Sequence, residues 1–204
     1  MAITTYSTLK VAIGDWLDRD DLGTQIDTFI DLCEARLARE LRIKAMETAL
    51  SETIASGVIT VPTDYLEMRY AYVDSTTAKW LDIKDPGWII ANYPTRSADS
   101  LPLFIARDAS TFIFGPYPDS TYSIKGTYYA KLAALSTSNE TNFFITNAPD
   151  LLLYGSLLAA TPYIGDDQRA NVWSAQYEQA IADIKMQDKH DRWPSRMPLA
   201  ATVR

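Results

Sequence analysis

The spacing of apolar residues changes twice along this chain of 204 residues, and the change restricts the folds open to it. Near both ends, apolar residues recur every three or four positions, which is the period of a helix packed on one side. From about residue 47 to about residue 132 they recur at every second position, as in a strand of a half-buried sheet. We therefore expect helices at both ends of the chain and a sheet between them.

Two amphipathic helices are predicted in the first part of the chain. The apolar face of the first consists of Leu9, Ala12, Ile13, Trp16 and Leu17. Ser7 can cap this helix, and Thr24 can cap the second, which we expect to run to about Lys44. The charged side of the second helix pairs Arg36 with Glu40 and Glu40 with Lys44, which indicates a face turned to solvent.

Seven strands are predicted in the middle of the chain, at residues 53–55, 58–61, 66–73, 79–83, 103–107, 111–114 and 122–130. The first two flank Ser56 and Gly57 and are expected to form a hairpin. The third and fourth should form another hairpin, and the last three a meander. Between the fourth and fifth, Asp85 can cap a short helix that has Pro86 at its first position.

Two more helices are predicted after the sheet. The third is expected to begin at Asn147, with Asp150 completing the cap, and to stop at Pro162 and Gly165. Its leucines surround the helix, so it should be buried on most sides. The fourth should follow residues 166–167, with a stripe made of Ala170, Trp173, Tyr177, Ala180, Ile181 and Ile184.

These elements predict an α+β fold. The N- and C-terminal helix pairs would form a four-helix bundle, with an inserted antiparallel β lobe and an extended C-terminal tail. The predicted boundaries are residues 1–45 for the first helix pair, 46–133 for the β-rich lobe, 134–192 for the second pair and 193–204 for the tail.

Composition argues against several classes of function. The net charge of −7 disfavours partners that are recognised through their phosphates. One cysteine and one histidine exclude an intrachain disulfide and a Cys/His zinc site, and they fit a reducing cytosol. We expect neither a signal peptide nor a membrane span, because no basic segment precedes an apolar run and no 18 apolar residues come together.

Catalytic motifs are not evident. His190 has no second histidine to assist it and should be exposed, and Cys33 lies on an apolar stripe and should be buried. The acidic pairs at residues 20–21 and 166–167 each precede a helix, where they stabilise its positive end without binding a metal. The glycines are too scattered for a phosphate or dinucleotide loop. We therefore expect no cofactor, no metal site and no enzymatic activity.

A set of short motifs follows a fixed order along the chain. They are Tyr6-Ser7-Thr8-Leu9, Trp16-Leu17, Phe29-Ile30, Glu34-Ala35-Arg36-Leu37, Arg39-Glu40-Leu41-Arg42, Gly115-Pro116-Tyr117-Pro118, Asn142-Phe143-Phe144, the run 149–157, Asp166-Asp167, and Trp173 with Tyr177. In this order the chain resembles the head-to-tail adaptor (connector) proteins of tailed bacteriophages. The resemblance covers nearly the whole chain and rests on residues that carry the fold.

The resemblance implies a structural virion protein and not an enzyme. It implies a homo-oligomeric ring of about twelve copies, held by contacts of cyclic symmetry, between the portal protein and a tail nozzle or tail-tube protein. Genomic DNA would pass through without specific binding, and no membrane is involved. The protein would act at the head–tail interface of the virion and occur in the host cytoplasm during assembly. The acidic balance suits such a channel, because a negative wall repels phosphate within roughly 10 Å.

The C-terminal tail is the predicted partner-binding segment. Its predicted contact residues are Trp193, Arg196, Met197, Leu199 and Arg204. The segment has no helical or strand period, but it combines apolar side chains with positive charge on an acidic protein. This combination suits docking to an acidic portal or to a neighbouring subunit.

Three alternatives remain open at this point. A tail-completion or stopper protein of the same particle would share these features, and only its partner would distinguish it. A carbohydrate- or peptide-binding module would use Trp80, Trp88, Tyr93 and Tyr117 as a groove, and it would be a monomer. A hydrolase lacks a base or nucleophile pair.

Overall fold

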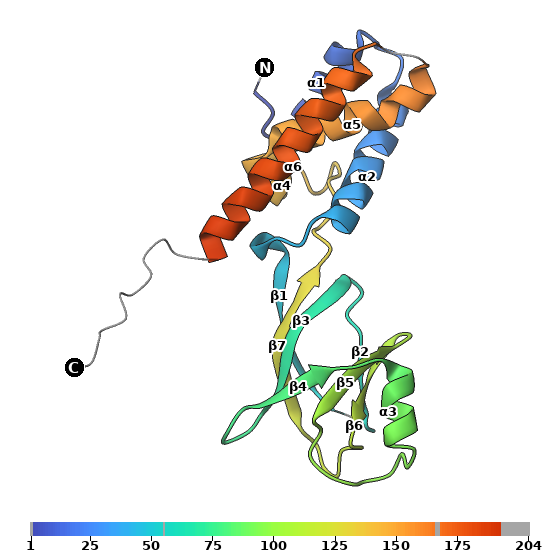
Figure 1. Ribbon diagram of the computed structural model, residues 1–204. Coiled ribbons are helices and arrows are strands. Elements are labelled where there is room, and N and C mark those ends of the chain that lie inside the picture. Colours follow the sequence, from blue (N-terminus) through green and yellow to red (C-terminus); the bar gives the residue numbers. More distant parts are fainter. Residues whose placement is uncertain (1, 55, 166–167, 193–204) are drawn as a thin grey trace, which may run out of the picture. The chain divides into compact units, whose positions relative to one another are not determined.

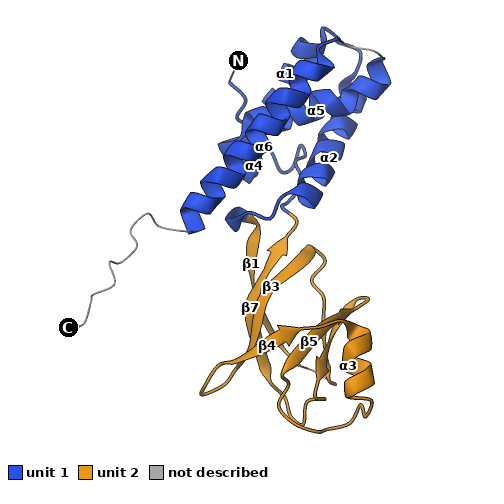
Figure 2. Ribbon diagram, viewed as in Figure 1, with its two compact units in different colours: residues 1–45, 132–204 blue, residues 46–131 orange. Residues whose placement is uncertain are grey.

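The chain divides into two compact units (Figures 1 and 2). In this computed structural model, residues 2–54, 56–165 and 168–192 are described. The first unit joins residues 1–45 to residues 132–204, and the second consists of residues 46–131. We call them the helical unit and the β unit.

The helical unit contains five α-helices in its described part. They are α1 (Tyr6–Leu17), α2 (Gly23–Glu40), α4 (Phe143–Asn147), α5 (Pro149–Ile164) and α6 (Ala170–Arg192), and the short 3-10 helix η1 (Lys44–Met46) follows α2. The cap of α1 is Thr5, whose hydroxyl accepts a hydrogen bond from the Thr8 amide, so the prediction of Ser7 was wrong. α2 has no side-chain cap and ends at Glu40, so Thr24 does not cap it and Lys44 lies beyond it.

A short helix that the sequence pattern did not predict, α4, precedes α5. The Asn142 side chain caps it by accepting a hydrogen bond from the Ile145 amide, 3.1 Å away. Asn147 is the last residue of α4, and its side chain donates to the Phe143 carbonyl oxygen. The prediction that Asn147 caps the following helix was therefore wrong, and α5 starts after Ala148 without a side-chain cap.

α5 forms the centre of the helical unit, as its all-round leucines predict. It packs against α1, α2, α4 and α6, and it buries all of its leucines except Leu158, which is half-buried. Gly155 allows this close packing: a Cβ atom there would collide with the Cys33 sulfur of α2 and lie 3.0 Å from the Tyr177 ring of α6. A glycine at this point thus lets two helices approach α5 together.

In its described residues, the β unit is a seven-stranded sheet with one α-helix, α3 (Pro86–Asn92). Its strands are β1 (Glu47–Thr53), β2 (Val58–Thr60), β3 (Tyr65–Asp74), β4 (Lys79–Ile83), β5 (Phe104–Asp108), β6 (Thr111–Gly115) and β7 (Ser123–Ala130). They lie in the order β1-β7-β3-β4-β5-β6-β2. All neighbours are antiparallel except β4 and β5, which are parallel because the segment containing α3 crosses over between them.

Some predicted strand pairings occur and others do not. The β3–β4 hairpin is confirmed, with Ala71 opposite Leu81, and Asp85 caps α3 as predicted. The hairpin around Ser56 and Gly57 was wrong, because β1 pairs with β7 and β2 pairs with β6. The meander was wrong in its last strand, since β7 pairs with β1 and β3 and not with β6.

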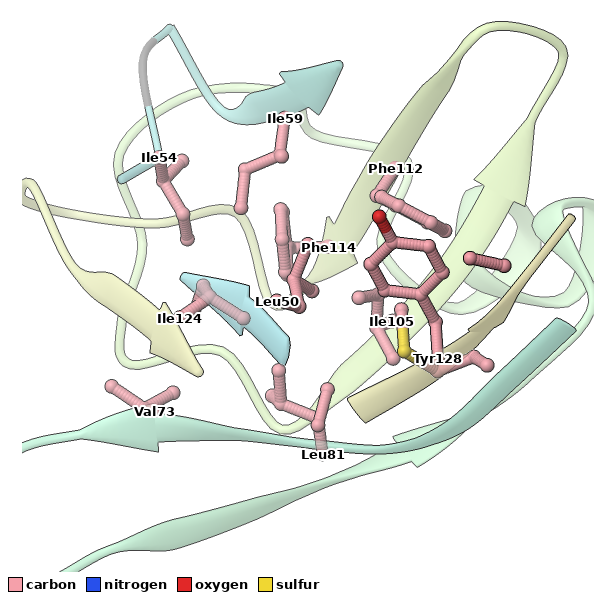
Figure 3. Close-up of a cluster of buried hydrophobic side chains, with 13 residues drawn as sticks. Leu50, Ile54, Ile59, Val73, Leu81, Ile105, Phe112, Phe114, Ile124 and Tyr128 are labelled. Atoms are coloured by element: carbon pink, nitrogen blue, oxygen red, sulfur yellow. The ribbon is translucent and has the colours of Figure 1, made fainter. Parts of the chain in front are cut away.

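The core of the β unit is a cluster of buried side chains that the sheet surrounds (Figure 3). Its members are Leu50, Ile54, Ile59, Met68, Ala71, Val73, Leu81, Ile105, Phe112, Phe114, Ile124, Tyr128 and Ala130. They come from all seven strands and from Ile54, which follows β1. On another side, α3 buries Ile89 against Ala106 and Ile113. This unit therefore has a hydrophobic core that does not depend on the helices at the chain ends.

The predicted four-helix bundle with an inserted antiparallel lobe is not the fold. The described residues form six α-helices and a seven-stranded sheet, which is still an α+β arrangement. A fifth helix, α4, joins the four expected ones in the helical unit, and Asn142 caps it. It was not predicted because it is too short to show an apolar stripe. The sheet contains a parallel pair of strands beside its antiparallel pairs, so it is not the antiparallel lobe that was predicted. It also has its own hydrophobic core, so it is a unit in its own right and not an insertion on a helical bundle. The predicted tail at residues 193–204 lies outside the described residues.

Gly126 of β7 is expected to tolerate no side chain. It lies between Leu50 of β1 and Ala71 of β3, where a Cβ would collide with the Tyr70 carbonyl oxygen and lie 2.9 Å from the Ala71 Cα. We expect Gly126→Ala to destabilise the β unit by about 1 to 3 kcal/mol, because these neighbours are backbone atoms that must move.

Denaturant unfolding will test this prediction, with Gly23→Ala as the control. Gly23 is the first residue of α2, and its Cβ would meet no atom within 4 Å. That variant should stay within about 0.5 kcal/mol of the wild type. Equal stability of the two variants would show that β7 can shift away from β3.

Candidate interaction surfaces

The residues considered for catalysis lie apart from one another. His190 is exposed near the end of α6, as predicted. Cys33 is 1% exposed, and burial raises the pKa of its thiol to about 12. At neutral pH it is therefore a neutral side chain packed against α5, as its position on the apolar stripe predicts.

The acidic pair at residues 20–21 has a local partner. Both carboxylate oxygens of Asp21 accept hydrogen bonds from the Arg19 guanidinium, at 2.6 and 2.7 Å. This interaction lowers the pKa of Asp21. The other pair, at residues 166–167, lies outside the described residues. In the described part of the chain, no group of three His, Cys, Asp or Glu side chains is placed to hold a metal ion.

Glu34 is a carboxylate whose burial was not predicted from the sequence. It accepts hydrogen bonds from the Leu135 amide, at 3.2 Å, and from the Asn142 side chain, at 2.8 Å. It thereby ties α2 to the segment before α4, whose cap is the same Asn142. The sequence feature that could have indicated this burial is the position of Glu34 beside Cys33 on the apolar face of the helix, because a carboxylate there needs hydrogen-bond partners.

A second polar cluster joins α2 to α6. The Arg36 guanidinium donates to Glu40 at 2.6 Å and lies over the Tyr177 ring, 4.3 Å from its centroid. The Tyr177 hydroxyl also donates to Glu40, at 3.0 Å. Burial raises the pKa of Glu40, but the hydrogen bonds from Arg36 and Tyr177 outweigh it, so the pKa is lowered. We interpret this cluster as a structural contact between α2 and α6, because the charges of Arg36 and Glu40 are paired with each other.

Two hollows lie along α6 on the helical unit. The first, of about 250 Å³, is lined by Ile43, Lys44, Ala45, Phe143, Ile184, Gln187, Asp188 and Asp191. Asp188 accepts hydrogen bonds from the Lys44 amide and from Arg192, which holds the end of α6 beside residues 43–45. The second is an open groove of about 580 Å³, lined by Asp15, Trp16, Arg169, Val172 and Trp173. Both combine apolar surface with carboxylates, which suits a protein partner more than a phosphate.

The four aromatic residues considered for a groove fall into separate groups, and only Trp80 and Trp88 are exposed, whereas Tyr93 and Tyr117 are half-buried. Trp80 contacts Tyr70 and Tyr72 of β3. Trp88 and Tyr93 contact each other and Phe104 of β5. Tyr117 donates to the Ser56 carbonyl oxygen and lies under Arg96. The four residues proposed for a carbohydrate groove therefore form three separate groups of contacts and not one continuous row of aromatic rings.

The predicted partner-binding residues cannot be placed on these surfaces. Trp193, Arg196, Met197, Leu199 and Arg204 all lie outside the described residues. Among the helices that the structure describes, none combines the length and the apolar character needed to cross a membrane.

The sequence was also compared with known proteins. A comparison with curated protein sequences found no match. Residues 4–202 match the profile of the family described as SU10 adaptor protein, so the match includes both units and most of the predicted tail. The chain therefore belongs to the SU10 adaptor protein family, a family of structural adaptors of bacteriophages.

Proposed function

We propose that this adaptor forms a ring of about twelve copies that joins the portal protein to the tail nozzle or tail tube and continues the DNA channel. The family match over residues 4–202 carries the proposal, because it spans both units in order. A phage structural adaptor acts in the virion. In our proposal it occupies the head–tail interface, after assembly in the host cytoplasm.

The surface of the helical unit supports a role in assembly. Its exposed large apolar side chains are Val11, Trp16, Leu32, Tyr163, Val172 and Met186. Single exposed apolar residues are common on monomers, but aromatic residues and methionine are enriched where proteins bind each other. The net charge of −7 suits a channel that DNA passes without binding, because phosphate is repelled and not held.

We propose that the tail provides the contact with the portal. The residues that would make it are Trp193, Arg196, Met197, Leu199 and Arg204. Residues 193–204 contain two arginines and no acidic residue, so this segment is positive on an acidic protein. Positive charge would guide it to an acidic portal surface, and the apolar side chains would supply the buried contact.

Cryo-electron microscopy of the portal mixed with this protein tests the proposal. With both at micromolar concentration, we expect a ring of extra density on the tail-facing end of the portal, with the symmetry of about twelve copies. The portal of an unrelated phage is the control and should stay uncapped. A bare portal end in the cognate mixture would contradict the adaptor role proposed here.

A further inference from the structure

Helix α6 carries a second stripe, on the side turned away from the core, in which four of the five residues are apolar and the middle one, Gln179, is polar. Its members are Val172, Ala175, Gln179, Ala182 and Met186, all of which are exposed. Val172 and Met186 are each 59% exposed. The spacing alternates between three and four residues, as in the contact line between two packed helices. The buried residues of α6, among them Trp173 and Tyr177, lie on the other side.

Helix α2 carries a shorter stripe, whose two middle residues, Leu32 and Ala35, are apolar and whose ends, Thr28 and Arg39, are polar. Thr28, Leu32, Ala35 and Arg39 follow one another at intervals of four, three and four residues. Leu32 is 53% exposed, and Ala35 is half-buried. The stripe covers about 16 Å of helix, and the stripe on α6 covers about 21 Å, so their lengths are compatible. We call them the α2 stripe and the α6 stripe.

The two stripes cannot cover each other within one copy. α2 and α6 both pack on α5 through their opposite sides, at the point where Gly155 lies between Cys33 and Tyr177. Each stripe therefore points away from α5 into solvent. A contact between them requires two copies of the chain.

The charges on and beside the stripes are complementary when the two helices run in opposite directions. On α2, Asp31 lies towards the N-terminal end of the stripe and Arg39 at its C-terminal end. On α6, Glu178 lies in the first half of the stripe and Lys189 just beyond its end. Antiparallel packing would bring Asp31 to Lys189 and Arg39 to Glu178. All four are exposed, and none forms an ion pair with another described residue.

We propose that the α6 stripe of one copy packs antiparallel on the α2 stripe of the next copy. The contact joins two different surfaces, so it is repeated around a closed ring and not limited to a dimer. This inference rests on the proposed ring and names its subunit interface. The apolar side chains form the centre of the contact, and the two charge pairs set its direction and register.

Cysteine cross-linking on the portal-bound ring tests the interface. Leu32→Cys copies and Met186→Cys copies are mixed in equal amounts with the portal and treated with a short bismaleimide. We expect cross-linked dimers in the mixture and none with either variant alone, because the contact joins unlike surfaces. Wild type shows the background from Cys33, which is buried. Ile83→Cys, whose native side chain is 52% exposed, replaces Leu32→Cys in the matched control and should not cross-link to Met186→Cys.

Charge reversal tests the direction of the two helices. Asp31→Lys or Lys189→Glu alone should raise the concentration needed for ring formation by about tenfold, and the double variant should restore it. If rings form on the portal but the mixture does not cross-link and the reversals have no effect, the interface is wrong and the adaptor role stands. Cross-linking by Leu32→Cys alone would also overturn the interface, in favour of a symmetric contact. If wild type forms no ring on the portal, both the proposed function and this interface fail.

Discussion

Replacing Leu157 with alanine is expected to lower the free energy of unfolding of the helical unit by about 2 to 5 kcal/mol. Leu157 lies in α5 and is 0% exposed. Its truncation removes apolar contacts and leaves a cavity that the helices around α5 cannot close completely. Chemical denaturation followed by the circular dichroism of the helices will measure the loss.

His190→Ala is the control for this prediction, because His190 is an exposed residue of the same unit. It should change the free energy of unfolding by less than about 0.5 kcal/mol. A large loss of stability in this variant would mean that the end of α6 is held by contacts of His190. A small loss in the Leu157 variant would mean that α5 is not the centre of the helical core.

Deleting residues 193–204 is expected to abolish capping of the portal while leaving the melting temperature almost unchanged. The segment has no apolar period that could contribute to either core, but it carries the positive charge and apolar side chains proposed for the portal contact. Thermal unfolding and co-sedimentation with the portal measure the two effects separately.

Two further variants separate charge from apolar contact. Arg196→Gln with Arg204→Gln should weaken portal binding and reduce its dependence on salt, because the remaining contact is less electrostatic. Replacing Trp193, Met197 and Leu199 with serine should weaken binding at every salt concentration. A truncated chain that caps the portal as well as the full-length chain would rule out a role for the tail.

Elements with local signals could be predicted from the sequence. Asp85 followed by Pro86 predicted the start of α3, and the all-round leucines predicted that α5 is buried. The hairpin of β3 and β4 was predicted from two alternating runs joined by a short polar turn. In these cases the decisive interactions lie within a few residues of each other, so the sequence displays them directly.

The polar contacts inside the helical unit could be predicted from the sequence only in part. The burial of Cys33 followed from its place on an apolar stripe, but that stripe did not show why Glu34 beside it is buried. Its partners are Leu135 and Asn142, about a hundred positions later in the chain, and only the packed helical unit brings them to it. Asn142 and Asn147 both have the side-chain chemistry of a helix cap, so the sequence could not distinguish them. The packing of the helical unit decided that Asn142 takes the capping role.

By itself, the sequence determined where the chain changes from helix to strand and back, because periodicity and caps act over a few residues. In the order of its motifs, it also indicated a phage adaptor. Only the tertiary structure decided that β1 pairs with β7, that β4 and β5 are parallel, and that the stripes on α2 and α6 stay exposed. Pairing and exposure depend on which distant surfaces bury each other, and many alternating strands of similar composition satisfy the same local pattern.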